Sequence, residues 1–187
     1  PGMWDGQCLD ISKSTLDCHH RAVFGYGLAV DPTAHAGPML EKSEGNAVHD
    51  GREIQGPLTQ SQVQPGKVYQ RILDNRTEQG LYEDLRVVVI DGQLPVVYRK
   101  RKSQEVRYTN ETAEVDLAKS PETVLSDAEI AQILAISAKM CAEFAELDVL
   151  RDRQDGRIYC VDLNPTPYGP PAGLPERERG KALDQIR

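Results

Sequence analysis

The segment from Arg157 to Leu163 constrains the fold most, because it has the pattern of a strand and leads directly into a Pro-Thr-Pro break. Successive side chains on a strand point to opposite faces, so Asp162 and Asn164 share one face and Val161 and Leu163 share the other. One face is therefore rich in oxygen atoms and the other is apolar. The segment predicts a strand with the core on one side and a polar site on the other.

The preceding residues predict a partner for this strand. Residues 146–151 also have a strand pattern, and Gln-Asp-Gly at 154–156 fits a three-residue hairpin loop with glycine in the left-handed position. If the two arginines that flank this loop pair with each other, Asp148 lies directly opposite Asp162. The hairpin thus predicts two carboxylates side by side on the polar face.

Two readings of this acidic face remain open on spacing alone. Like charges directly opposite each other destabilise a sheet, so two carboxylates and an amide oxygen at one place favour a bound cation. Magnesium fits, because it prefers one or two carboxylates together with substrate phosphates. The alternative is a solvated polar face with a different strand register.

Length and charge limit the classes of protein to consider. A chain of 187 residues is expected to form one domain, or one large and one small lobe, around a sizeable core. The net charge is −7, from 22 Lys and Arg against 29 Asp and Glu, and no long basic run occurs, which argues against nucleic-acid binding. The dense basic cluster Arg99–Lys102 is either a charged strand end or a local anion site.

Membrane and secretory features are absent from the sequence. There is no apolar run near the ~20 residues that span a bilayer and no secretory signal at the start. The four cysteines lack a CxxC pair, which is typical of reduced thiols in a cytoplasmic protein. The sequence opens with Pro1, as a fragment, a processed chain or a trimmed chain would. We therefore expect a cytoplasmic protein without a membrane partner.

Two helices have clear start signals. Ser12 can cap a helix from Lys13 to about Phe24. Ser126 and Glu129 form a capping-box pattern, and an apolar stripe follows as far as Phe144. This stripe predicts a helix that packs on the apolar face of the sheet.

Turn signals complete the prediction of an α+β fold. Asp-Gly pairs at 50–51 and 91–92 are strong hairpin signals, and both predict antiparallel strands. A short strand at 39–42 ends at Lys42 and leads into the small-residue loop 43–47. A lysine followed by such a loop is a candidate phosphate cradle, since backbone N–H groups and one cation can face an anion.

In this order the features resemble the ATP-grasp superfamily, especially its glutathione-synthetase-like and ribosomal-protein glutamate ligase branches. The resemblance runs from about Asp10 to Pro167, and residues 162–167 are close to the family's ending motif. It implies antiparallel sheets and packed helices in two lobes around a nucleotide cleft. Residues 1–73 would form the small lobe, with the lysine loop and hinge, and 74–187 the larger lobe, with the metal and phosphate site and a Pro-rich tail.

The resemblance also implies individual site residues. The implied ligands of two magnesium ions, or of manganese in their place, are Asp148, Asp162 and Asn164. The implied phosphate-binding lysines are Lys42 and, as a weaker candidate, Lys13. The implied hinge at the adenine is Gln70, Arg71, Ile72 and Leu73, with Asp74 at the ribose. The groups implied at the acyl phosphate and the transferring phosphoryl group are Arg86 and one of Arg99, Lys100 and Arg101, with Asn110 on the same face.

The function implied is an ATP-dependent, ADP-forming ligase that joins a carboxylate to an amine or thiol through an acyl phosphate. The chain departs from the family at Asp162, where glutamate is usual, and at Arg71, where an acidic residue is common. The family usually has a further N-terminal domain before the point where this chain begins, so the chain is either incomplete or uses a homo-oligomer or a partner subunit that supplies this domain. The alternatives are a non-catalytic or regulatory module that binds ATP and magnesium, and a purely structural α+β protein.

Overall fold

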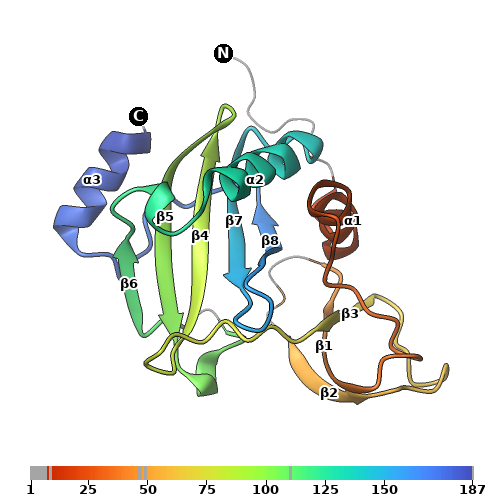
Figure 1. Cartoon of the computed structure of the whole chain (residues 1–187). Coiled ribbons are helices and arrows are strands. Elements are labelled where there is room, and N and C mark those ends of the chain that lie inside the picture. The colour runs from red at the N-terminus through yellow and green to blue at the C-terminus, as the bar shows by residue number, and fades with distance from the viewer. Residues whose placement is uncertain (1–7, 9, 46–47, 49, 110, 187) are drawn as a thin grey trace.

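The computed structural model describes residues 8, 10–45, 48, 50–109 and 111–186. The chain forms two antiparallel sheets with helices packed against the larger one, so the predicted α+β class is confirmed (Figure 1). Asn110, Asn46 and Ala47 lie outside the described residues. Among the helices of the described part, none combines the length and apolar character that crossing a membrane requires.

The smaller sheet has the strand order β2-β1-β3. Its strands are β1 (Gly37–Ser43), β2 (Arg52–Gly56) and β3 (Lys67–Arg71). The predicted tight hairpin at 50–51 is wrong, because β1 and β2 begin to pair only at Glu41 and Arg52. The Asp50 carboxylate instead accepts hydrogen bonds from the backbone N–H (2.9 Å) and hydroxyl (2.7 Å) of Ser43. Asp50 therefore closes a longer loop rather than a two-residue turn.

The larger sheet has the strand order β6-β5-β4-β7-β8. Its strands are β4 (Tyr82–Ile90), β5 (Gln93–Lys102), β6 (Glu114–Leu117), β7 (Phe144–Arg151) and β8 (Ile158–Asn164), and the short helices η1 (Gln104–Val106) and η2 (Pro121–Thr123) lie in its connections. The predicted hairpin at 91–92 is confirmed, since Ile90 pairs with Gln93. Asp91 and Gly92 have φ angles of 47° and 71°, as a tight hairpin turn requires.

The β7–β8 hairpin has the predicted pairing at its acidic centre but not at its loop. Asp148 lies opposite Asp162, whereas closer to the loop Val149 pairs with Cys160, so Val161 is an extra residue in β8. Such a bulge reverses the alternation of side chains. Val161 therefore lies on the same side as Asp162, and its predicted place on the core face is wrong.

The first helix, α1 (Lys13–Phe24), begins and ends where its sequence predicts. The Ser12 hydroxyl accepts a hydrogen bond from the Thr15 N–H (3.3 Å), and Gly25 ends the helix with a φ of 79°. The helix packs against β8 and the next helix at the edge of the larger sheet (Figure 1). Along the sequence, the strands of the smaller sheet precede residue 73 and those of the larger sheet follow it. The lobe boundary at residue 73 stays a prediction. Helix α1 precedes that boundary in the sequence but packs on the larger sheet.

The second helix, α2 (Asp127–Lys139), has the predicted capping box between Ser126 and Glu129. It ends before the predicted Phe144, because Cys141 takes a left-handed conformation with a φ of 53°. Phe144 then opens β7 and pairs with Ile90. The apolar residues at the C-terminal end of the predicted stripe thus continue its helical spacing but belong to a strand.

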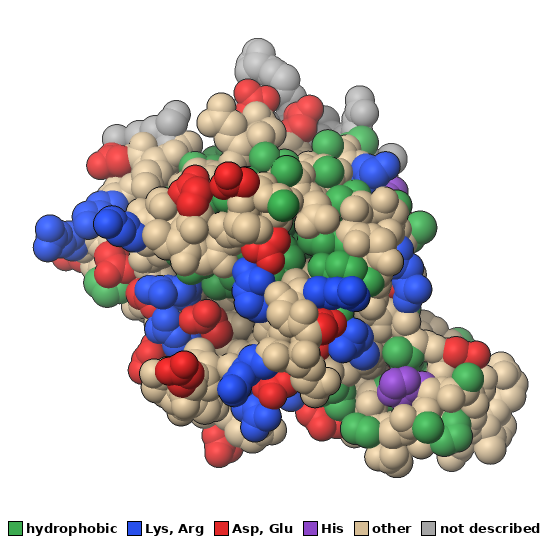
Figure 2. All heavy atoms as spheres, in the orientation of Figure 1, with side chains coloured by type: hydrophobic (Ala, Val, Ile, Leu, Met, Phe, Trp, Pro, Cys, Tyr) green, Lys and Arg blue, Asp and Glu red, His purple; other side chains and the backbone are tan. Residues whose placement is uncertain are grey.

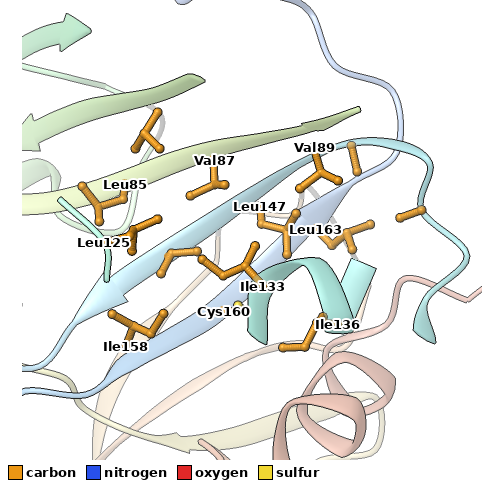
Figure 3. Packing of buried hydrophobic residues seen from close by; sticks show 14 of the residues in the cluster. Leu85, Val87, Val89, Leu125, Ile133, Ile136, Leu147, Ile158, Cys160 and Leu163 are labelled. Carbon is orange, nitrogen blue, oxygen red and sulfur yellow. The ribbon is translucent and has the colours of Figure 1, made fainter. Parts of the chain in front are cut away.

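The main core lies between α2 and one face of the larger sheet. Ile133 and Ile136 of α2 belong to one buried cluster with Leu147 and Leu163 of the strands, and Figure 3 shows Ile133 lying against the strands. These four side chains have no solvent exposure. Burying each contributes roughly 1.5–3 kcal/mol. Since this face is filled, a functional site on the sheet has to use the opposite face.

The opposite face is covered at one end by the C-terminal helix α3 (Glu176–Ile186). Ala182 of α3 and Leu174 pack on Val88, Val96 and Tyr98 of the sheet. The part of this sheet face that α3 does not cover lines a cleft. On the side of the molecule shown in Figure 2, basic and acidic side chains are interspersed rather than gathered into one large patch of a single sign.

Candidate functional site

A cleft of about 510 Å³ lies between the two sheets and is lined by residues of both. It gathers side chains from segments that are far apart in the sequence. The predicted site residues on its lining are Lys13, Lys42, Gln70, Arg71, Ile72, Leu73, Arg86, Lys100, Asp148, Asp162 and Asn164. The prediction of one shared site is thus consistent with their positions, while their individual roles stay predictions.

Arg99 and Arg101 are not brought into the cleft. Arg99 Nε donates to Asp116 Oδ2 (2.7 Å), and Arg101 Nε donates to Glu83 Oε2 (2.9 Å), and neither arginine is part of the lining. Side chains alternate along β5, so these arginines face away while Lys100 faces the cleft. Of the three alternatives predicted on this strand, Lys100 is the one in position.

Asp74 also lies outside the cleft lining. Both of its oxygens accept hydrogen bonds from the Arg76 guanidinium, at 2.7 Å each, which lowers the pKa of Asp74 to about 2. The structure therefore does not bring this carboxylate to the position predicted for a ribose contact.

Arg71 lines the cleft, but its guanidinium points into the protein. Its Nη2 lies 3.0 Å from an oxygen of Asp152, a residue with no solvent exposure, and its Nη1 donates to the Tyr159 hydroxyl (2.8 Å). These bonds tie the end of β3 to the β7–β8 hairpin. Arg71 thereby holds the predicted hinge against the larger sheet.

An apolar slot lies beside this hinge. Its walls are Leu28, Leu40, Leu73, Leu150 and Val161, which come from both sheets and their connections. The β8 bulge is what places Val161 in this slot. Such a slot suits a flat aromatic ring, which gains from contact on both faces.

Arg86 occupies the acidic end of the cleft. Its Nε and Nη2 donate to the two oxygens of Asp148, at 2.9 and 3.1 Å. Burial opposes charge on both partners, yet their pairing outweighs it, raising the pKa of Arg86 and lowering that of Asp148. Asp148 is therefore already engaged on both oxygens by a cation of the chain itself.

Asp162 is the carboxylate best placed for an external cation. Its Oδ1 is shielded from solvent and has no hydrogen-bond partner within the described part of the chain. Burial raises its pKa and the Asp148 charge adds to this, against the opposing effect of Lys13 and Lys42. An orphaned carboxylate oxygen of this kind fits a magnesium ion.

The remaining ligand positions are only partly assembled. Asn164 Oδ1 accepts hydrogen bonds from the N–H (3.1 Å) and hydroxyl (3.0 Å) of Thr166, which fix its side chain at the cleft. No group of three or more His, Cys, Asp or Glu side chains that could hold a metal occurs among the described residues. Asp148 can become a ligand only when Arg86 releases it.

Two lysines reach the same end of the cleft from the other side. Lys42 Nζ lies 3.4 Å from the Val161 carbonyl oxygen, and Lys13 Nζ donates to the Gly45 carbonyl (2.7 Å). Burial, with the nearby charge of Lys13, lowers the pKa of Lys42 to about 8. The charge of Asp162 acts in the opposite direction on that pKa. These ammonium groups form a compact site for an anion such as phosphate.

The loop after Lys42 is tied to helix α1. The Glu44 carboxylate accepts hydrogen bonds from the backbone N–H and the hydroxyl of Ser14, both at 2.8 Å. This contact sets the position of Lys13 at the start of the helix. The predicted phosphate cradle at 43–47 stays a prediction, because Asn46 and Ala47 lie outside the described residues.

The cleft also contains charged residues that were not predicted as site residues. Lys102 Nζ lies 2.8 Å from Asp84 Oδ2, and Asn75 Nδ2 donates to the other oxygen (3.1 Å). Burial raises the pKa of Asp84, and the Lys102 charge opposes this. Strand alternation could have found both, since Asp84 shares a face with Arg86 and Lys102 shares one with Lys100.

A connection between the two sheets closes another side of the cleft. Arg107 Nη1 and the Tyr108 hydroxyl donate to the same oxygen of Glu53 in β2, at 3.2 and 2.6 Å. Arg107 also donates to the Leu73 carbonyl. The contacts with Glu53 join residues more than fifty positions apart, and the contact with Leu73 spans 34 positions, so no local pattern in the sequence predicts them.

Comparisons with known proteins identify the fold. No family model and no curated protein matches this sequence. Among solved structures, the ATP-grasp ligase PsnB with its minimal precursor, Mg and ADP matches 97% of this chain with a TM-score of 0.62 and 17% identity. The L-amino acid ligase from Bacillus licheniformis matches 84% of the chain with a TM-score of 0.57 and 13% identity.

The macrocyclase MdnC from Microcystis aeruginosa, bound to its precursor peptide MdnA, matches 94% of the chain with a TM-score of 0.51 and 13% identity. The chain has the ATP-grasp fold, as its motifs predict. It spans 60% of the length of that PsnB chain, 60% of MdnC and 41% of the L-amino acid ligase. At these identities the similarity establishes the fold and leaves the reaction to be argued from the cleft.

Proposed function

We propose that this chain binds ATP with magnesium and acts as an ADP-forming ligase that joins a carboxylate to an amine or thiol. The observation that carries the proposal is the arrangement at one end of the cleft. There Asp162, with its orphaned oxygen, lies close enough to Lys13 and Lys42 for their charges to lower its pKa against the effect of burial. A cation-binding carboxylate beside phosphate-binding lysines is what a magnesium–nucleotide complex requires.

Each part of the cleft has a role in this proposal. Adenine lies in the apolar slot beside the hinge 70–73, and Lys42 and Lys13 bind the phosphates. Asp162 and Asn164, joined by Asp148, would hold the magnesium, which neutralises phosphate charge when bound. Asp148 could join them only where Arg86 no longer pairs with it, and Arg86 would then keep its 3.5 Å contact with Glu146.

The reaction itself needs mainly alignment and charge neutralisation. A carboxylate oxygen of the substrate attacks the γ-phosphorus, the bond to the bridging oxygen breaks, and ADP leaves. The neutral amine or the thiolate of the acceptor then attacks the acyl-phosphate carbonyl, the bond to the phosphate oxygen breaks, phosphate leaves, and the acceptor's proton passes to solvent. Arg86 and the buried Lys100 would stabilise the phosphoryl oxygens. No protein nucleophile is required.

A second candidate is a nucleotide-binding module without ligation. It is favoured by the Arg86–Asp148 pair, in which a guanidinium of the chain occupies both oxygens of a predicted metal ligand. Both candidates bind magnesium–ATP, and only the ligase consumes it.

The test is phosphate release from magnesium–ATP in the presence of amino acids, small peptides and hydroxy acids as carboxylate substrates. A ligase releases ADP and phosphate only when the right carboxylate is present. Saturable binding of magnesium–ATP by calorimetry, without turnover across the screen, would support the binding module instead. Absence of magnesium–ATP binding contradicts both candidates.

The lowered pKa of Lys42 predicts a pH dependence of nucleotide binding. Affinity for magnesium–ATP is expected to be constant up to about pH 8 and then to fall by up to about tenfold per pH unit as Lys42 loses its proton in the free protein. Folding stability of the free chain should change in the opposite direction. It should rise between about pH 8 and 10.5, since only the unfolded chain then holds this proton.

Calorimetric titrations of magnesium–ATP between pH 7 and 9.5 check this expectation. Lys42→Gln should bind weakly at pH 7 and lose most of the decline above pH 8. Lys139→Gln, at an exposed position on α2, makes the same chemical change away from the cleft and should behave as wild type. An unchanged pH profile in Lys42→Gln would remove Lys42 from the phosphate site.

A further inference from the structure

Arg107 joins three parts of the cleft wall that lie far apart in the sequence. It directly follows η1 in the connection from β5 to β6, and only 10% of its side chain is exposed. Its Nη1 donates to Glu53 of β2 at 3.2 Å, and its Nη2 donates to the Leu73 carbonyl at the hinge. Its guanidinium also lies over the ring of Tyr82 in β4, 4.1 Å from the centroid. One side chain thus links the smaller sheet, the hinge and the larger sheet.

Tyr108 supports the contact with the smaller sheet. Its hydroxyl donates to the same Glu53 oxygen at 2.6 Å. Burial and then this hydrogen bond raise the pKa of Tyr108, so the hydroxyl stays protonated and remains a donor at neutral pH. The Arg107 guanidinium lies 4.9 Å from the centroid of the Tyr108 ring. Two adjacent residues therefore hold one carboxylate of the smaller sheet.

These contacts act on two walls of the apolar slot, Leu40 and Leu73. Glu53 lies directly opposite Leu40 in the β1–β2 pairing, so both side chains are on the same face of the smaller sheet. The backbone carbonyl of Leu73 itself accepts the second hydrogen bond from Arg107. Because the donors of a guanidinium form a planar, rigid fork, Arg107 fixes the distance between these two walls.

The effect of this arrangement is on position more than on folding stability. The Glu53 side chain is 43% exposed, and ion pairs at solvent-accessible positions contribute little to the free energy of unfolding. Arg107 and Tyr108 both line the cleft, yet the roles proposed above assign them no part in the site. What the contacts with Glu53 determine is how the smaller sheet is placed over the slot.

We propose that Arg107 is a positioning residue that sets the width of the apolar slot, with Glu53 and Tyr108 as its partners. It acts through Leu40 and Leu73, and not through the phosphates or the metal. The assignment rests on the proposed function for the identity of the ligand, since that function places adenine in the slot. Whether Arg107 holds the two sheets together can be measured without any nucleotide.

The first test compares two ligands that share the metal and a diphosphate and differ by the adenosine. Magnesium–ADP occupies the slot and the phosphate end, whereas magnesium–pyrophosphate occupies only the phosphate end. In calorimetric titrations, Arg107→Met and Glu53→Ala should each weaken magnesium–ADP binding about tenfold, as expected for the loss of a hydrogen bond to a charged group, and leave magnesium–pyrophosphate binding unaltered. A purely structural defect would weaken both ligands alike.

The matched control is Glu114→Ala. Glu114 is also a glutamate in a strand, its side chain is 60% exposed, and it pairs with Arg101 outside the cleft lining. This variant should bind both ligands as wild type does. Glu53→Ala, at a half-exposed position, decides the question if Arg107→Met fails to fold.

The second test is amide hydrogen exchange of the ligand-free full chain. Peptides from β1 and β2 should exchange faster in Arg107→Met and Glu53→Ala than in wild type and Glu114→Ala, because the smaller sheet is then less firmly held. Unchanged exchange, unchanged magnesium–ADP affinity or equal weakening of both ligands overturns the proposal. If neither ligand binds to wild type, the proposed function is wrong, and the exchange rates still decide whether Arg107 holds the two sheets together.

Discussion

Replacing Arg86 by methionine is expected to lower the free energy of unfolding by about 3–5 kcal/mol. Arg86 is the guanidinium shared by Asp148 and Glu146, at 2.9 and 3.5 Å. Methionine keeps much of the side-chain volume but leaves two carboxylates without their cation. Thermal unfolding should show the loss as a decrease in Tm of roughly 10 °C or more for a chain of this size.

A matched control lies on the neighbouring strand. Arg99→Met removes an arginine that pairs with Asp116 on the opposite side of the sheet, where Asp116 keeps a second arginine, Arg101, at 2.8 Å. No carboxylate is left without a cation, so the expected loss is about 1 kcal/mol or less. Equal losses in the two variants would contradict the special position of Arg86.

The cause of the loss can be tested by removing the charges that Arg86 balances. Adding Asp148→Asn and Glu146→Gln to Arg86→Met should recover most of the lost stability. The deficit of the single variant should also shrink as the pH falls. The wild type loses the contribution of Asp148 as its lowered pKa is reached, whereas the variant gains stability when its uncompensated carboxyls are protonated.

The features predicted from the sequence are those that depend on near neighbours. The cap at Ser12, the capping box at Ser126 and the turn at 91–92 each involve residues within a few positions of one another. The pairing of Asp148 with Asp162 also follows from one hairpin. These local rules, with the order of motifs, were enough to predict an ATP-grasp fold.

In the β7–β8 hairpin the predicted pairing of Asp148 with Asp162 is correct although the predicted register next to the loop is not. The predicted register is wrong next to the turn, where Val149 pairs with Cys160, and right at Asp148 because the bulge at Val161 restores it. A bulge depends on what packs on each face of the strand, so a simple alternation cannot predict it. Here the core takes Cys160 while the apolar slot takes Val161.

Errors among the site residues have the same origin. Arg99, Lys100 and Arg101 are all basic, so the sequence alone does not distinguish them. Lys100 differs because its side chain is on the face of β5 that lines the cleft. The contacts of Arg107 and Tyr108 with Glu53 depend on how the two sheets meet. Cleft residues of this kind follow from tertiary packing, which a local pattern does not contain.

Replacing Asp162 by asparagine is expected to separate magnesium–nucleotide binding from folding stability. The variant should bind magnesium–ATP about 100-fold more weakly, a loss of roughly 2.8 kcal/mol, because the amide has the same shape but lacks the charge that holds the ion. Binding of ATP without magnesium should change much less. Calorimetric titrations with and without magnesium measure both quantities.

The same substitution should stabilise the free protein. Asp162 carries a shielded oxygen without a partner in the described structure, and burial raises its pKa, so its charged form opposes folding at neutral pH. Asparagine removes that charge, and we expect an increase of about 1 kcal/mol in the free energy of unfolding without ligand. The stability advantage over wild type should fade as the pH decreases and the wild-type carboxyl is protonated.

Asp127→Asn is the control, since it makes the same chemical change at an exposed position at the start of α2. It should leave the magnesium dependence of binding unaltered. Equal magnesium–ATP affinity in Asp162→Asn and wild type would remove Asp162 from the metal site. A gain in stability together with weaker magnesium–ATP binding has a single physical explanation. The free chain bears the cost of a carboxylate that only the metal–nucleotide complex compensates.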